Sequence, residues 1–313
     1  MTSLPSAARK ILNEGTLCYL AAPSPAGPHV TPVVFVLDGG RVWGTTGRST
    51  TKAKLWRREP VAGGLVGFEG RWLVFRGGVT LYDALDPFTW PLSLRRGPRV
   101  ASASVRFSLK NARFFAGYAR DVTRVPLAWT PPGRVIFSIE VEAGGVFGDE
   151  QELERWGSWG SEAQGLKAFR RATPGASGDK LPADVRGLLD EPGRGTVALA
   201  SAEGPVVLPT RWTREGGTFF AKLPTRLLKL VEPSTQGPAS LVIDRASSWR
   251  ATEMKGVLIR GPASVYVASE LRSGLSELGR HVDGLSDEDA VLRIRPRTFV
   301  WWSGWASGTV RRS

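Results

Sequence analysis

Residues 45–52, TTGRSTTK, bring together groups that could bind an anion. Within eight residues they supply several hydroxyl groups, one guanidinium and one ammonium. The flanking pattern places them between the end of a strand and the start of a helix, where free backbone N–H groups and the helix dipole favour negative charge. A phosphate group suits this donor set. Serine and threonine are also common helix caps, so a plain helix start without a ligand is the alternative.

The sequence offers little other side-chain chemistry. Cys18 is its one cysteine, which excludes an internal disulfide and a cysteine-based zinc site. His29 and His281 are its two histidines, too few for a three-histidine metal site. We therefore predict no metal site and assign no catalytic residue. His29 lies in a predicted turn, where we expect a solvated side chain.

The composition is that of a folded, basic chain. Its 313 residues are 42% hydrophobic and carry a net charge of +13, from 42 Lys and Arg against 29 Asp and Glu. Such a charge attracts nucleic acid, acidic membranes or phosphorylated small molecules. The basic residues are scattered, so a nucleic-acid-binding module is the weakest of our hypotheses. No apolar run reaches the length of a membrane span and the first residues lack the apolar core of a secretory signal, so we expect a cytoplasmic protein without a membrane partner.

The chain contains one pattern twice. LPSAARKILNEG at 4–15 matches LPADVRGLLDEPGRG at 181–195, and GPHVTPVVFVLDGGRVW at 27–43 matches GPVVLPTRWTREGGTFF at 204–220, both at an offset of 177. Gly77 matches Gly261 at an offset of 184, which implies a short insertion between the matched blocks. One offset held over some fifty positions indicates a duplicated domain.

Both copies predict the same elements. A short helix is followed by strands joined by a Gly-Pro turn and a Gly-Gly turn, then a helix start, two more strands, a helical stretch and a last strand. The last strands lie near 134–142 and 290–302. Many short strands with regular turns indicate a mainly β protein, an antiparallel barrel with short helices. We place the first domain at 1–148 with an insertion at 84–130, a linker at 149–180 and the second domain at 181–313.

The order of these elements, with the motif T-T-x-x-S-x-x-K at 45–52, resembles the pyridoxamine 5′-phosphate oxidase-like FMN-binding split β-barrel superfamily. The resemblance covers residues 4–83 well and 134–148 weakly in copy one, and 181–267 and 290–304 in copy two. Members of this superfamily are usually homodimers with the flavin between two barrels. The resemblance therefore implies two tandem split barrels packed as an internal pseudo-dimer, and it leaves any further oligomerisation open.

The resemblance assigns roles within residues 45–52. Thr45 and Thr46 would face the ring or the ribityl chain of the cofactor. Arg48, Ser49 and Lys52 would hold its phosphate, with Thr50 beside them.

The resemblance also implies contributions from two strands of copy one. Arg71 and Trp72 open a strand on which relatives often carry a basic residue near the phosphate, and an exposed arginine is the alternative. Pro32 and Val33 lie on a strand whose backbone passes close to the ring edge in relatives.

Copy two departs from the motif. Lys222-Leu223 replaces the two threonines, so the hydroxyls that would face the ring are lost. Thr225, Arg226 and Lys229 still offer one hydroxyl and two cations. We expect one good site formed mainly by copy one and a degenerate second site. Trp301 and Trp302 would line the groove of the good site, or would pack in the barrel and on its surface.

The resemblance implies a flavin- or deazaflavin-dependent oxidoreductase, in which the cofactor carries the hydride chemistry for an unidentified small organic substrate. FMN and the deazaflavin coenzyme F420 are both candidates, and the arginine-rich insertion would suit the acidic tail of F420. The alternative is a split-barrel protein that holds a cofactor or haem without turnover. His29 or His281 would then be the axial ligand of the haem.

Overall fold

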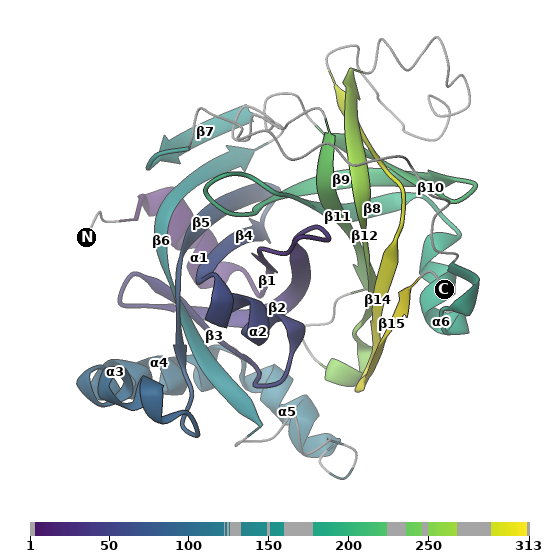
Figure 1. Cartoon of the computed structure of the whole chain (residues 1–313). Helices are drawn as coiled ribbons and strands as arrows, with labels where there is room; N and C mark the ends of the chain where they lie inside the picture. Colours follow the sequence, from purple (N-terminus) through teal and green to yellow (C-terminus); the bar gives the residue numbers. More distant parts are fainter. Residues whose placement is uncertain are drawn as a thin grey trace.

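The computed structural model describes residues 4–121, 123, 125, 133–148, 151–159, 178–223, 236–245, 250–267 and 289–311. Most of these residues lie in two antiparallel sheets, each of which closes into a six-stranded barrel. Figure 1 shows the first barrel in purple to teal and the second in green to yellow beside it. In the described part of the chain, no helix combines the length and the apolar character needed to cross a membrane.

The first barrel is built from β1 (Leu17–Ala22), β2 (His29–Asp38), β3 (Arg41–Gly47), β4 (Val61–Phe68), β5 (Arg71–Tyr82) and β6 (Arg134–Gly148). The strands lie in the order β3-β2-β1-β4-β5-β6, and β3 pairs with β6 to close the barrel. Gly39 and Gly40 form the turn between β2 and β3, and both have positive φ, at 56° and 75°. This hairpin is the one that the Gly-Gly pair predicts.

The second barrel repeats this connectivity. Its strands are β8 (Gly193–Leu199), β9 (Val206–Glu215), β10 (Thr218–Leu223), β11 (Gln236–Arg245), β12 (Lys255–Val267) and β13 (Ala290–Ile294). They lie in the order β11-β8-β9-β10-β13-β12, and β11 pairs with β12 to close the barrel. Each strand has the same two neighbours as its counterpart in the first barrel. The duplication and the tandem split-barrel fold expected from the sequence are thus confirmed.

Short helices accompany the strands. The helix α1 (Ser6–Glu14) buries Ala8, Ile11 and Leu12, the residues at helical spacing, against the core of the first barrel. The helix α2 (Thr51–Arg58) follows β3 and buries Lys52, Ala53 and Trp56. The second barrel is preceded by α6 (Ala183–Arg186) and the 3-10 turn η5 (Gly187–Leu189).

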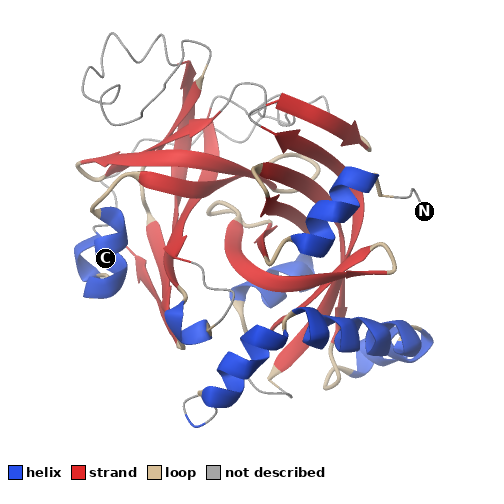
Figure 2. Ribbon diagram, turned by 180° about the vertical axis from the view of Figure 1, so that it is seen from behind, coloured by secondary structure: helices blue, strands red, loops and turns tan. Residues whose placement is uncertain are grey.

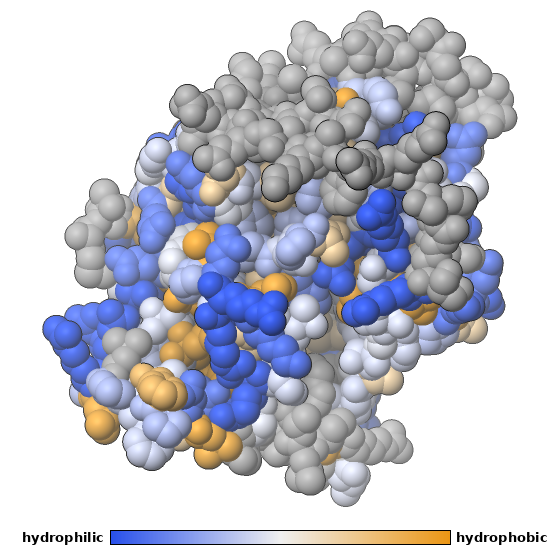
Figure 3. All heavy atoms as spheres, in the orientation of Figure 1, coloured by the Kyte–Doolittle hydropathy of each residue, from blue (hydrophilic) through white to orange (hydrophobic). Residues whose placement is uncertain are grey.

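The insertion after β5 is helical where it is described. It contains the 3-10 turn η1 (Pro87–Thr89) and the helices α3 (Trp90–Arg95), α4 (Gly97–Lys110) and α5 (Ala112–Arg120). Ala103 and Phe107 of α4 pack on Val36, Trp43 and Tyr82 of the first barrel. Figures 1 and 2 show α3 and α4 at the edge of the molecule, and Figure 3 shows orange, apolar atoms exposed there beside blue, hydrophilic ones.

Three strands differ from the sequence-based expectation. The segment 149–180, expected as a linker, contains β7 (Gln151–Trp156), which pairs with β6 and extends the first sheet. The last strand expected near 290–302 is two strands, because Pro296 lies between β13 and β14 (Thr298–Ser303) and cannot donate a ladder hydrogen bond. A further strand, β15 (Ala306–Arg311), pairs with β14 at the edge of the second sheet.

The barrels share an apolar contact, which we call the seam: β1, β2, β4 and β5 of the first barrel against β9, β11 and β12 of the second. The core of the second barrel continues across it, since Ala21, Val30, Leu65 and Val74 of the first barrel belong to the same buried cluster. Removing this continuous apolar surface from water holds the two halves together.

Equivalent residues of the two copies lie on the two sides of the seam. On one side, Ser240 in β11 donates a hydrogen bond of 2.6 Å to the carbonyl oxygen of Pro28. On the other side, the counterparts at the offset of 177 are Gly63 in β4 and Pro205, and the Pro205 carbonyl oxygen lies against the Gly63 backbone. The two barrels therefore form the internal pseudo-dimer that the sequence predicts, with the same elements on both sides of the contact.

Candidate functional site

Lys52 is the residue of the 45–52 segment whose environment is most unusual. It lies in the first turn of α2, and only 2% of it is exposed. Its Nζ donates to the hydroxyl of Thr31 at 2.6 Å and to the Thr31 carbonyl oxygen at 3.4 Å. Burial lowers the pKa of Lys52 to about 7, because the ammonium is poorly solvated there. The side chain thus points inward, toward β2, rather than into solvent.

His29 lies on β2 two residues before Thr31, and it is also buried. The expectation of a solvated turn histidine was therefore wrong: β2 begins at His29, and the second barrel covers this end of the strand. Burial lowers the pKa of His29 to about 3, with smaller contributions from the charges of Lys52 and Arg260. Its Nδ1 is buried without a hydrogen-bond partner among the described residues.

Arg260 approaches the same place from the second barrel. It lies in β12, is 9% exposed, and its Nε is buried without a hydrogen-bond partner in the described part of the protein. Burial lowers its pKa, and the nearby Arg311 lowers it further. The positive charge of Arg260 lowers the pKa of His29. We call Lys52, Arg260 and the neutral imidazole of His29 the cation cluster, because the charges of both cations act on His29.

The contact between the barrels positions this cluster. In the β11–β12 ladder, Arg260 is the register partner of Ser240. Ser240 bonds the carbonyl oxygen of Pro28, and Pro28 directly precedes His29. Ser240 therefore links the two residues: its hydrogen bond to Pro28 positions His29 of the first barrel, and its strand pairing positions Arg260 of the second barrel.

The duplicated positions on the other side of the seam differ in two described residues. Val206 is the counterpart of His29 at the offset of 177, and Arg76 is the counterpart of Arg260 at the offset of 184. Arg76 forms an ion pair with the Glu203 carboxylate and donates to the Glu203 carbonyl oxygen at 3.3 Å. Ala26 stands where Glu203 would have its counterpart, so no carboxylate is available at that position beside Arg260.

The hydroxyls of the 45–52 segment mostly serve the protein itself. Thr50 caps α2, because its Oγ1 accepts a hydrogen bond of 3.3 Å from the backbone N–H of Ala53. The hydroxyls of Thr46 and Thr50 lie 3.2 Å apart and share one hydrogen bond. Thr45 accepts hydrogen bonds of 3.0 Å and 2.8 Å from the Arg134 guanidinium, and Ser49 is exposed.

Arg48 does not join Lys52 but forms an ion pair with Asp83, an acidic residue outside the 45–52 motif. Its Nη1 lies 2.5 Å from Oδ1 of Asp83, a carboxylate that is 2% exposed. Arg57 contacts the other oxygen of Asp83 at 2.9 Å and donates to the Arg48 carbonyl oxygen at 3.0 Å. The two arginines and Asp83 tie the start and the end of α2 to the end of β5.

The strand residues implied by the resemblance divide into two groups. Pro32 and Val33 follow Thr31 on β2 and are therefore next to the cation cluster in the chain, with Pro32 buried. Arg71 is exposed at the hairpin between β4 and β5, where its register partner is Phe68. Trp72 is partly buried and packs on the apolar cluster that crosses the seam.

The candidate residues of copy two are described in part. Lys222 forms an ion pair of 2.9 Å with the buried Asp289, so its charge is balanced within the second barrel. Trp301 and Trp302 are partly buried on β14, where Trp302 lies over the backbone of Gly256 and Trp301 over Gly308. They therefore pack on the second barrel. Thr225, Arg226, Lys229 and His281 lie outside the described residues.

The insertion of the first copy contacts the second barrel close to its C-terminal hairpin. Tyr118 of α5 packs edge-to-face on Trp305, with ring centroids 4.9 Å apart. Asp121 accepts hydrogen bonds from Arg250 at 3.1 Å and from the Thr252 hydroxyl at 3.2 Å. These contacts join the insertion of the first copy to the second barrel, and the sequence analysis did not predict them.

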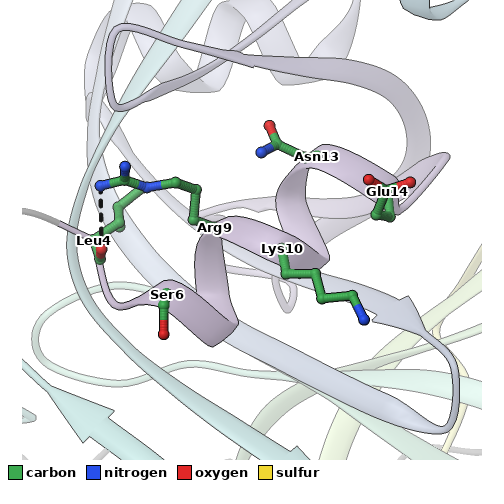
Figure 4. A pocket seen from close by; sticks show the side chains of 6 residues that line it. All are labelled: Leu4, Ser6, Arg9, Lys10, Asn13 and Glu14. Carbon is green, nitrogen blue, oxygen red and sulfur yellow. Dashed lines mark hydrogen bonds between the residues drawn. The ribbon is translucent and has the colours of Figure 1, made fainter.

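A surface hollow lies elsewhere, beside α1, and is lined by Leu4, Ser6, Arg9, Lys10, Asn13 and Glu14. Figure 4 shows Arg9, Lys10 and Glu14 projecting in different directions around it, so they present no converging donor set. Its one hydrogen bond among these residues is internal, from Arg9 to the Leu4 carbonyl oxygen at 3.5 Å. Across the described residues, no group of three potential metal-binding side chains is present.

Sequence reasoning missed Thr31 and Arg260, and it gave His29 no part in binding a phosphate. The signal for Arg260 was present: it directly precedes Gly261, which matches Gly77 at the offset of 184, so Arg260 and Arg76 are a duplicated pair. What the sequence could not show is that Glu203 neutralises one member of the pair across the seam while Ala26 leaves the other member without that partner.

No family model and no curated protein matches this chain. Solved structures do match, each over about half of it. An F420 reductase is 21% identical, with 45% of this chain and 98% of that chain covered and a TM-score of 0.29. A pyridoxamine 5′-phosphate oxidase-related, FMN-binding protein from Nostoc punctiforme is 16% identical, with 46% and 86% covered and a TM-score of 0.31. An FAD-binding protein from Mesorhizobium loti is 16% identical, with 46% and 95% covered and a TM-score of 0.31.

The likeness is one of fold. Each matched structure aligns with less than half of this chain, whereas the chain has two barrels. Sequence identities and TM-scores this low carry no argument about activity, so function has to be argued from the side chains of the seam.

Proposed function

We propose that this protein is a flavin- or deazaflavin-dependent oxidoreductase of the pyridoxamine 5′-phosphate oxidase-like split-barrel type, acting on a small organic substrate. The observation that supports it is the cation cluster: two cationic side chains and one histidine, buried together and drawn from both barrels. Buried charges normally have partners, and a cluster of one sign is costly unless an anion balances it.

A phosphate group fits this cluster chemically. His29 Nδ1 and Arg260 Nε are buried polar atoms without partners among the described residues, and both can donate to phosphate oxygens. Arginine binds phosphate through its planar fork and lysine through a compact charge. We propose that Lys52 and Arg260 hold the phosphate of the cofactor and that His29 donates one hydrogen bond to it.

The asymmetry of the seam supports one cofactor per chain. Where His29 and Arg260 stand on one side, the other side has Val206 and an Arg76 that is already paired with Glu203. An anion on that side would compete with the Glu203 carboxylate and would find no histidine. In this proposal the side with His29 and Arg260 is the good site, and the side with Val206 and Arg76 is the degenerate one.

The chain's own residues would hold and orient the cofactor rather than react. The isoalloxazine or deazaflavin ring supplies hydride transfer when it is bound. In this proposal the backbone of Pro32 and Val33 on β2 lies along the ring edge, since β2 leads directly away from His29 and Thr31.

Titration of the purified protein with FMN and with F420, followed by fluorescence, tests this proposal. We expect Arg260→Gln to weaken binding at least about tenfold, because it removes a charge-assisted contact. Arg76→Gln is the matched control, since it changes the duplicated residue, and we expect it to leave the affinity unchanged. A loss that is equal in both variants, or no binding of FMN or F420 by the wild type, would contradict the proposal.

Turnover separates an enzyme from a cofactor carrier. A bound cofactor that is reduced by a hydride donor and then reoxidised by an added acceptor, in repeated cycles, supports the oxidoreductase. A cofactor that stays bound but is not reduced supports the alternative of a non-catalytic binding protein. Arg260→Gln should lower turnover through cofactor occupancy, so saturating cofactor should restore it.

A further inference from the structure

The insertion of the first barrel exposes large apolar side chains that no part of the described chain covers. Phe88 is 94% exposed, Leu94 is 81% exposed, Leu85 is 60% exposed and Trp90 is 50% exposed. All four lie in η1 and α3 or just before them, within ten residues of one another. Single exposed apolar residues are ordinary, but several in one short segment mark an interaction surface.

The neighbouring helix continues this surface. On α4, Ala103 and Phe107 face the barrel, whereas Val105 and Leu109 are 60% and 71% exposed. Val105 and Leu109 are four residues apart and therefore share the outer face of the helix. We call the exposed residues Leu85, Phe88, Trp90, Leu94, Val105 and Leu109 the apolar edge.

The charged residues around the apolar edge are mostly basic. Residues 84–120 contain seven lysines and arginines and one acidic residue, Asp86. The Asp86 carboxylate caps η1 by accepting a hydrogen bond of 3.1 Å from the backbone N–H of Phe88. Arg95 and Arg99 are exposed beside Leu94. The edge therefore presents aromatic and aliphatic side chains in a segment with an excess of positive charge.

We propose that the apolar edge is a peripheral docking surface for an anionic lipid membrane. Phenylalanine, tryptophan and leucine that enter the headgroup region, together with arginines that contact anionic lipids, are the features of interfacial membrane attachment. The expectation of no membrane partner rested on the lack of a spanning segment and of a secretory signal. Attachment at the interface requires neither of these.

The shape and the charge of the edge favour a lipid surface over a protein partner. Figures 1 and 2 both place α3 and α4 at the periphery of the molecule. The side chains of the apolar edge are each at least half exposed there. A lipid surface accepts protruding side chains individually, whereas a protein partner needs a matching pocket for each of them. A second copy of this chain is disfavoured, because a symmetric contact would bring two strongly positive edges together.

Co-sedimentation of the full-length protein with vesicles tests this inference. The vesicles are phosphatidylcholine alone and phosphatidylcholine mixed with anionic phosphatidylglycerol, at low and at high salt. We expect binding to the anionic vesicles at least about tenfold stronger than to the neutral ones, and weaker at high salt. Phe88→Ser with Leu94→Ser, and separately Arg95→Gln with Arg99→Gln, should each reduce binding at least about tenfold.

Leu153→Ser is the matched control, since Leu153 is 51% exposed on β7, outside the apolar edge, and its loss should leave binding unchanged. All substituted side chains are exposed, so thermal unfolding should not change and folding should not confound the result. No binding of the wild type to anionic vesicles, or equal losses in Leu153→Ser and Phe88→Ser/Leu94→Ser, would overturn the inference. A wild type that is a dimer by light scattering, and that Phe88→Ser/Leu94→Ser makes monomeric, would instead assign the edge to a second copy.

Discussion

The Tyr19 hydroxyl of the first barrel lies 3.2 Å from each carboxylate oxygen of Asp244 in the second barrel, and it donates a hydrogen bond to that carboxylate. Burial raises the pKa of Asp244 from 3.8 to about 6, and the hydrogen bond from Tyr19 only partly opposes this effect. The seam thus contains a carboxyl group that is more easily protonated in the folded protein than in the unfolded one.

This pair predicts a pH dependence of stability. Between about pH 4 and pH 6 the folded state binds more protons at Asp244 than the unfolded state does, so stability falls as the pH rises through this window. One pKa unit corresponds to about 1.4 kcal/mol, so the decrease is roughly 2 to 3 kcal/mol. We expect Asp244→Asn to remove it. Urea unfolding of both proteins from pH 4 to pH 7 measures the difference, and parallel profiles would show that Asp244 contributes nothing.

The close approach of the barrels predicts a steric requirement at Gly63. A Cβ at this position would overlap the carbonyl oxygen of Pro205, and backbone cannot move aside as a side chain can. We expect Gly63→Ala to lower the free energy of unfolding by about 2 kcal/mol or more. Gly97→Ala is the control, because a Cβ there meets nothing within 4 Å. Equal stability of the two variants would mean that the seam is looser than described.

The bridge formed by Asp83 predicts a structural role for Arg48. Asp83→Asn should lower the free energy of unfolding by about 2 kcal/mol, a reduced figure because Arg48 and Arg57 are partly exposed. We expect the affinity for FMN to stay the same. If Arg48 instead serves the phosphate, releasing it from Asp83 should tighten FMN binding, and the same titration would reveal this.

The environment of Lys52 predicts that cofactor binding depends on pH. Because the pKa of Lys52 is lowered to about 7, it loses its charge above pH 7 when no anion is present. An anion binds the charged form, so affinity should fall by up to about tenfold per pH unit above pH 7. The phosphate of FMN also titrates, near pH 6. The quantity to measure is therefore the ratio of wild-type to Lys52→Met affinity, and a ratio that does not change with pH would contradict this prediction.

The fold could be predicted largely from the sequence, because the duplication preserved the residues that turns require. The Gly-Pro and Gly-Gly pairs recur at one offset, and they mark the same hairpins in both barrels. The break between β13 and β14 was missed because the apolar residues on both sides of Pro296 were assigned to one strand, although Arg295, Pro296 and Arg297 separate them.

The candidate site was predictable only in part. Lys52 could be proposed as a phosphate ligand from the sequence, because all residues of its motif are neighbours in the chain. The motif also included Arg48. A sequence does not show that Asp83 pairs with Arg48 in the fold. Arg260 and His29 meet across the seam, and such a meeting depends on how two domains pack rather than on any local pattern.

The stoichiometry of cofactor binding tests the central claim most directly. Equilibrium dialysis of the purified chain against FMN, and separately against F420, measures the number of molecules bound per chain. The cation cluster on one side of the seam predicts one molecule, lost in His29→Val, which installs the residue found at the duplicated position. Two molecules bound per chain, or binding that His29→Val and Arg260→Gln both leave intact, would contradict the account.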